Sequence, residues 1–171
     1  FGNVPIVTDF TQKELPANSP RKDVFAFIEK ELKDILPILP SGTTYAKFTQ
    51  NVANTLLARL YLNAEVYTGT PRWQDCLDAC SKVQGYSLTP NYKASFAIQN
   101  EKSPEIIFSI PYDHKQGTVG NYLASMTYHY NQKLAFDPAG VYQWCGNGIC
   151  AQPGLYSSFD EKDVRRQCLL I

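Results

Sequence analysis

The chain has 171 residues, 44% hydrophobic and 19% charged, which is enough apolar sequence to build a folded core and argues against disorder. Its 16 basic and 16 acidic residues cancel, so the composition argues against nucleic acid or an anionic membrane surface as the main partner. No apolar run approaches the length of a membrane-spanning helix. Because the chain opens FGNVPIV without an initiator Met, we expect it to be an internal fragment of a longer protein.

The first predicted helix begins at Ser19-Pro20, where a serine N-cap precedes proline at the first helical position. Pro37 and Pro40 are expected to end it. Its apolar residues recur at helical spacing: Val24, Phe25, Ile28, Leu32, Ile35 and Leu36.

Two further helices are predicted at residues 49–67 and 71–84. Gly69 fits the left-handed position that follows a helix, and Thr70-Pro71 repeats the start signal of the first helix. The very short connection predicts an antiparallel pair, as in tetratricopeptide-like repeats. The expected buried positions are Val52, Ala53, Leu56, Leu57, Leu60 and Ala64 in the second helix, and Trp73, Cys76, Leu77, Cys80 and Val83 in the third, with Cys76 and Cys80 as free core thiols.

The pattern changes after Pro104. EIIFSIPY, residues 105–112, predicts a short strand, and residues 113–158 are rich in glycine, proline and aromatic residues. The predicted fold class is therefore mainly α, with tetratricopeptide-like hairpins and a loop-rich region that contains short strands. We divide the chain into a helical scaffold, residues 1–104, and a loop-rich region, residues 105–171, within one folded domain.

The segment WCGNGIC, residues 144–150, allows several interpretations. A zinc site would need four ligands, usually in tighter pairs, and neither His114 nor His129 shows such a spacing. A redox dithiol would more often be spaced as C-x-x-C. A Cys145–Cys150 disulfide is compatible with the Gly-Asn-Gly turn, in which Asn147 tolerates a left-handed φ, if the compartment is oxidising. We expect no metal, no cofactor and no catalytic residues.

Aromatic and amide side chains gather in the same region. Aromatic rings can lie against the C–H faces of a sugar, and amides offer a donor and an acceptor to adjacent hydroxyls. This mixture suits a neutral, flat-faced ligand, although packing in the core would also account for aromatic residues. The candidate carbohydrate-binding residues are Trp144, Tyr122, Tyr128, Tyr130, Asn147 and Gln143.

Several motifs, in order, resemble the SusD/RagB family. NVANTLLARLYLNAEVYTG is similar to its signature helix, and EIIFSIPYD and FDEKDVRR are similar to later segments of the family. The resemblance implies a glycan-binding lipoprotein on the outer face of the bacterial outer membrane, with helices as scaffold and loops as binding region. It also implies delivery of the glycan to a SusC-like TonB-dependent transporter, no catalysis, and membrane attachment only through a lipid anchor that this chain lacks.

Within that family the loop sequence is most similar to a starch-binding member, so we expect an α-glucan as ligand and Trp144 as the ring that stacks on it. WCGNGIC would then be a rigid loop that presents this ring. Two other functions stay open. One is a helical-repeat scaffold for protein partners, and the other is a glycoside hydrolase, which would need two acids that face one cleft.

Overall fold

The computed structural model describes residues 2–97, 100–111, 126–129 and 146–168. The chain divides into two compact units, Phe1–Ser109 and Ile110–Ile171. The predicted helices of the first unit are present, and no strand occurs among the described residues beyond one isolated bridge between Val4 and Ser19. The mainly α fold class is confirmed.

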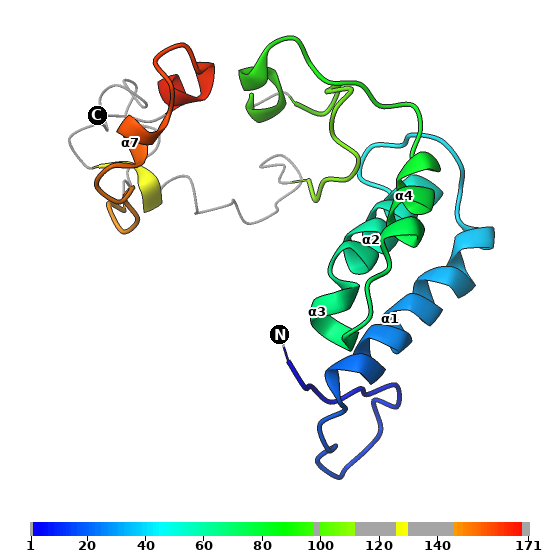
Figure 1. Ribbon diagram of the computed structural model, residues 1–171. Helices are drawn as coiled ribbons and strands as arrows, with labels where there is room; N and C mark the ends of the chain where they lie inside the picture. Colours follow the sequence, from blue (N-terminus) through cyan, green and yellow to red (C-terminus); the bar gives the residue numbers. More distant parts are fainter. Residues whose placement is uncertain (1, 98–99, 112–125, 130–145, 169–171) are drawn as a thin grey trace. The chain divides into compact units, whose positions relative to one another are not determined.

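The first unit is built from four α-helices and two short 3-10 turns (Figure 1). In chain order these elements are α1 Arg21–Ile35, η1 Leu36–Ile38, α2 Gln50–Leu62, α3 Ala64–Thr68, α4 Trp73–Ser81 and η2 Tyr92–Phe96.

Helix α1 begins one residue later than the sequence predicts. Ser19 is engaged in the bridge to Val4, and Pro20 occupies the N-cap without a side-chain hydrogen bond. The side chain of Asn3 replaces the missing cap, because its Oδ1 accepts a hydrogen bond of 2.9 Å from the backbone N–H of Arg21. The N-terminal segment therefore stabilises the start of α1, a role that no local signal revealed.

The predicted second helix is divided in two. Asn63, at φ −104° and ψ 10°, leaves the helical region, and its side-chain amide donates to the carbonyl of Arg59. Asparagine offers the backbone such local alternatives to a helix, which explains the break. Gly69 lies at φ 81°, so the predicted left-handed residue after the helix is confirmed.

The core lies where α2 meets α1 and α4. Its buried residues include three alanines, and such small side chains let helices approach closely. Leu57 and Tyr61 of α2 are each 4% exposed. The core consists of Phe25, Leu32, Leu57, Ala58, Tyr61, Ala64 and Ala79.

Helix α4 presents a different side to the core than its sequence pattern predicts. It begins at Trp73, two residues after Pro71, and buries Ala79. Trp73 is 49% exposed and Leu77 63%, and Cys80 is an exposed free thiol. The small Ala79 side chain allows the closest approach to α2, so the large apolar side chains lie away from the core. The prediction that Cys80 is a core thiol was wrong.

Helices α2 and α4 lie side by side (Figure 1) and run in opposite directions. The evidence is Asn51, at the start of α2, whose side chain contacts the chain just after α4. Its Nδ2 donates to the carbonyls of Gly42 and Gln84, and its Oδ1 accepts from the N–H of Gln84. Asn51 is only 6% exposed, so these bonds satisfy an otherwise costly buried amide. The predicted antiparallel pair is present.

A charged cluster joins three helical segments. The carboxylate of Glu29 in α1 accepts a hydrogen bond of 2.8 Å from the Tyr61 hydroxyl and contacts Lys33 at 2.5 Å and Arg72 at 3.2 Å. Burial acts to raise the pKa of Glu29, but the hydrogen bonds from Lys33, Tyr61 and Arg72 together hold it below its ordinary value. Arg72 also bonds Asp75 at the start of α4.

The prediction of a strand at residues 105–112 was wrong for residues 105–111, which the structure describes as irregular. In the part of the chain that the structure describes, they have no strand to pair with. Packing holds this segment instead, because the ring of Phe108 contacts that of Phe48 edge to face, with centroids 6.0 Å apart. The residue just before the segment is also held, since the N–H of Ser87 donates to the carbonyl of Pro104. In the second unit the structure describes helix α7, Leu155–Ser158, and the turn η5, Val164–Cys168.

The core packing predicts the effect of Leu57→Ala. Truncating a buried leucine should lower the free energy of unfolding by about 2–5 kcal/mol, measured by chemical denaturation. Leu77→Ala, on the exposed side of α4, is the matched control and should change it by less than about 0.5 kcal/mol. Equal losses in the two variants would contradict this core.

The charged cluster predicts a pH-dependent effect of Glu29→Gln. At pH 7 this change should lower the free energy of unfolding by about 1.5–3 kcal/mol, as expected for hydrogen bonds to a charged group. Because the folded-state pKa lies below its ordinary value of 4.5, the stabilisation is complete above pH 4.5 and is lost as the pH falls through the lower folded-state pKa. Denaturation curves of both proteins should therefore converge at acidic pH.

Asp34→Asn is the control for that experiment. The Lys30–Asp34 pair on the same helix is 68% and 58% exposed, so its loss should leave the free energy of unfolding nearly unchanged. A difference between wild type and Glu29→Gln that stays constant down to pH 2 would contradict the role of the ionised carboxylate.

Candidate functional site

Two segments of the second unit that carry candidate ligand residues are joined by backbone hydrogen bonds. The N–H of Asn147 donates to the carbonyl of Tyr128 at 3.0 Å. The N–H groups of Gly148 and Ile149 both donate to the carbonyl of Met126, at 2.9 and 3.0 Å. We call residues 126–128 and 147–149 the paired loops. They bring together a tyrosine and an asparagine that are 19 positions apart in the sequence.

The turn chemistry of Gly-Asn-Gly explains this geometry. Asn147 lies at φ 45°, in the left-handed region that asparagine tolerates better than most residues. A Cβ on Gly148 would meet the terminal methyl of Met126, so glycine permits the close approach of the two loops. The positive φ that the sequence anticipated at Asn147 is confirmed.

Only part of the predicted site falls within the described residues. Tyr128 is half-buried and Asn147 is exposed. Cys150 is exposed with a free thiol in the structure, while its predicted partner Cys145 lies outside the described residues. The remaining candidates, Trp144, Tyr122, Tyr130 and Gln143, also lie outside them.

Among the described residues no three histidine, cysteine or acidic side chains come close enough to hold a metal ion. In the same ranges no helix combines the length and apolarity needed to cross a membrane.

Ion pairs and ring contacts organise the segment that follows the paired loops. Arg165 pairs with Asp163 at 2.5 Å, and the hydrogen bonds from Arg165 lower the pKa of Asp163 to about 2. The guanidinium of Arg165 lies over the ring of Phe159 and that of Arg166 over the ring of Tyr156, at 5.5 and 4.2 Å. This segment is the FDEKDVRR motif, and these contacts give its charged residues a structural role.

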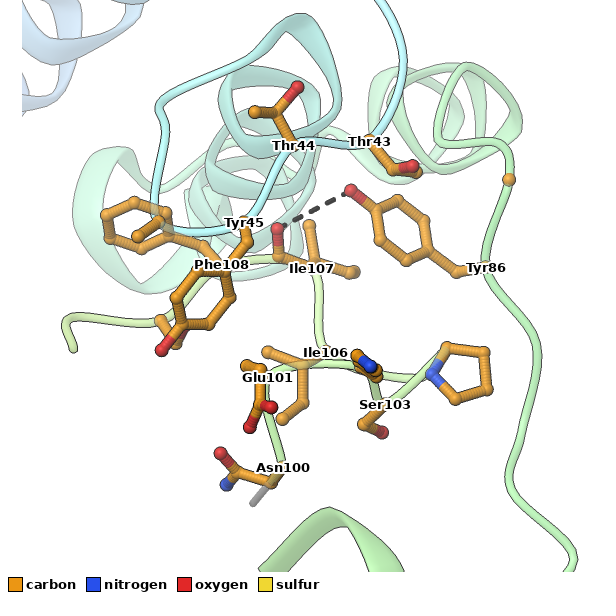
Figure 2. A pocket seen from close by; sticks show the side chains of 15 residues that line it. Thr43, Thr44, Tyr45, Tyr86, Asn100, Glu101, Ser103, Ile106, Ile107 and Phe108 are labelled. Atoms are coloured by element: carbon orange, nitrogen blue, oxygen red, sulfur yellow. Dashed lines mark hydrogen bonds between the residues drawn. The ribbon is translucent and has the colours of Figure 1, made fainter. Parts of the chain in front are cut away.

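The first unit holds a pocket that the sequence did not reveal. We call it the loop pocket; its volume is about 330 Å³, and Figure 2 shows it from close by. In that view Tyr45 and Phe108 lie on one side and Tyr86 on the other, while Asn100, Glu101 and Ser103 lie along a third side. Its lining comes from residues 43–46, 85–86, 100–104 and 106–109.

Local contacts hold the walls of the loop pocket. The hydroxyl of Tyr86 donates to the carbonyl of Ile107 at 3.4 Å, as Figure 2 marks. Gly85 lies at φ 87°, and a Cβ there would approach the Thr43 methyl to 3.2 Å, so only glycine fits without strain. Ala46 at φ 57° adopts a left-handed conformation, which costs roughly 1–2 kcal/mol for a residue with a side chain.

Sequence reasoning missed this pocket for a definite reason. SGTTYAKF opens with serine, glycine and two threonines, which is typical of a simple connection. Tyr45 and Tyr86 are 41 positions apart, and only the antiparallel pair of α2 and α4 brings their loops together. The signal that the sequence did offer was glycine at positions 42 and 85. Glycine favours turns with positive φ, and both residues adopt such a φ in the structure.

The fold and the paired loops define a mainly helical protein that carries aromatic and amide side chains on loops. The chain is 34% identical over 122 residues to the starch-binding protein SusD of Bacteroides thetaiotaomicron. This match covers 66% of the chain and 22% of SusD, so the chain spans about a fifth of the length of that relative. No family model matches the chain.

The fold is similar to the crystal structure of a SusD-like protein from Bacteroides fragilis, with a TM-score of 0.55 and 23% identity. This match covers 66% of the chain and 23% of that protein. The sequence match and the fold match agree with the resemblance that the motifs indicated: the chain is similar to SusD in sequence and SusD-like in fold.

Proposed function

We propose that the protein binds a glycan at the cell surface and does not catalyse a reaction on it. The observation that carries this proposal is the backbone pairing of Tyr128 with Asn147, because it joins the two segments that are richest in aromatic and amide side chains. In our proposal residues 105–171 bind the glycan and residues 1–104 form the helical scaffold within one folded domain.

The proposed site uses aromatic stacking and amide hydrogen bonds. In the sequence Trp144 stands three residues before Asn147, and Tyr130 stands two residues after Tyr128. Trp144 would stack on a sugar ring with Tyr122, Tyr128 or Tyr130 beside it, and Asn147 and Gln143 would bond its hydroxyls. The exposure of Asn147 supports such a role.

The similarity to SusD, which is a starch-binding protein, supports starch or a maltooligosaccharide as the ligand. By the same resemblance we propose that the full-length protein is anchored by a lipid on the outer face of the outer membrane. It would pass the glycan to a SusC-like TonB-dependent transporter.

The described acids of the second unit favour binding over hydrolysis. A glycosidase needs one carboxyl group with a raised pKa as general acid. The hydrogen bonds from Arg165 instead lower the pKa of Asp163 to about 2. The carboxylate of Asp160 accepts a hydrogen bond of 2.8 Å from the N–H of Lys162, which is a structural use of its Oδ1 atom.

A helical scaffold for protein partners is the second candidate function. The observation that favours it is the exposed apolar side of α4, where Trp73 and Leu77 are 49% and 63% exposed. Under this alternative, Trp73 rather than Trp144 would be the tryptophan that a partner covers.

We also propose that Cys145 and Cys150 form a disulfide that stiffens the loop after Trp144. In protein isolated from an oxidising compartment and alkylated without reduction, mass spectrometry should find both thiols protected. Cys80 is exposed and is the internal control, because it should be alkylated in the same sample. Alkylation of Cys145 and Cys150 to the same extent as Cys80 would disprove the disulfide.

The central test is Trp144→Ala. Stacking on an aromatic ring is worth about 0.5–1.5 kcal/mol beyond area burial, so the loss of a whole tryptophan should weaken maltoheptaose binding about tenfold or more. Calorimetric titration of the folded variant measures this change.

Trp73→Ala is the matched control, since it removes the other tryptophan from the first unit. It should leave maltoheptaose affinity unchanged. If Trp144→Ala binds as tightly as wild type, Trp144 is not the stacking residue; if Trp73→Ala alone weakens binding, the ligand site lies on α4.

A further inference from the structure

The loop pocket shares no residue with the paired loops or with the side chains that the proposed function assigns to glycan binding. All of its lining residues belong to the first unit, between Thr43 and Ser109. Its volume of about 330 Å³ falls at the lower end of the range for ligand pockets, about 300–1,000 Å³. A pocket of this size fits a ligand of one or two sugar rings rather than a long chain.

Aromatic rings form opposite sides of the pocket (Figure 2). Tyr45 is 51% exposed and Phe108 42%, so both rings offer apolar surface to a ligand. The edge-to-face contact with Phe48 holds the ring of Phe108, and the hydrogen bond to Ile107 holds that of Tyr86. Rings that are already held lose little conformational freedom when a ligand binds.

Polar groups with unused hydrogen-bonding capacity lie between these rings. The amide of Asn100 donates to the carbonyl of Ser95 at 3.0 Å, which leaves its Oδ1 as an acceptor without a partner among the described residues. Within the same ranges the hydroxyls of Thr43 and Thr44 make no hydrogen bond either. These are the groups that the hydroxyls of a sugar could bond.

The charges of the pocket exclude an anion as the preferred ligand. Glu101 and Lys102 are its charged residues, one of each sign, and both are exposed. A phosphate or carboxylate site would instead gather cations or aligned backbone N–H groups. Flat apolar walls, hydroxyl and amide groups and a balanced charge together match a neutral, polyhydroxylated ring.

We propose that the loop pocket binds one or two rings of a neutral sugar and is a second glycan contact, separate from the paired loops. The choice of sugar as ligand rests on the proposed function, but the side chains that bind it are different. Tyr45 is the residue that stacks on the sugar, and Asn100 and the two threonines bond its hydroxyls.

The test is a maltose titration of the ¹⁵N-labelled chain in the Trp144→Ala background, followed by amide chemical shifts. The expected result is shifts at residues 43–46 and 100–104. Tyr45→Ala in the same background should weaken the binding about twofold to tenfold, the range that one stacked ring accounts for. Tyr45→Phe keeps the ring and should retain the affinity.

Tyr92→Ala is the matched control, because Tyr92 is another exposed tyrosine of the first unit, at 42%, and does not line the pocket. It should leave the titration unchanged. If maltose shifts the second unit of the wild-type chain and nothing in the first, the pocket proposal is overturned and the proposed function stands.

Shifts confined to the loop pocket would support the pocket and contradict the role of Trp144. If maltose shifts no amide in the wild-type chain, the pocket proposal is overturned together with the preference for an α-glucan.

Discussion

The arrangement of the helices depends on the hydrogen bonds and ion pairs that the ionised carboxylate of Glu29 makes. It lies on α1, accepts a hydrogen bond from Tyr61 of α2 and contacts Arg72, the N-cap residue of α4. Arg72 also lies over the Tyr61 ring, 4.8 Å from its centroid. Removing one partner from such a cluster leaves a partly buried charge unpaired. The cluster therefore favours the one helix arrangement in which all of its charges are paired.

That arrangement determines where the loops of the first unit lie. With α2 and α4 antiparallel, the start of α2 meets the end of α4, and Asn51 joins both to the loop at Gly42. The two walls of the loop pocket continue from these points, one through Thr43–Tyr45 and the other through Gly85 and Tyr86. The pocket is therefore a consequence of the helical pair, although none of its stacking residues belongs to a helix.

In the second unit, backbone hydrogen bonds position the loops. The carbonyls of Met126 and Tyr128 accept hydrogen bonds from the N–H groups of residues 147–149, and these bonds fix the direction of the chain through those three residues. A site built on loops needs such fixed points, since stacking on a sugar depends on ring orientation. The resemblance to SusD and the geometry of the paired loops thus support the same proposal from independent grounds.

The sequence by itself determined the features that depend on neighbouring residues. These include the helical segments, the positive φ of Gly69 and Asn147, the alanines that allow close packing, and the family motifs. Only the tertiary structure decided which side of α4 faces the core, because Ala79 permits a closer approach to α2 than Trp73 or Leu77 does. It also decided that Asn3 caps α1, that residues 105–111 form no strand, and that Tyr45 and Tyr86 line the same pocket. Each of these depends on a partner far away in the sequence, and such a partner leaves no periodic or local signal.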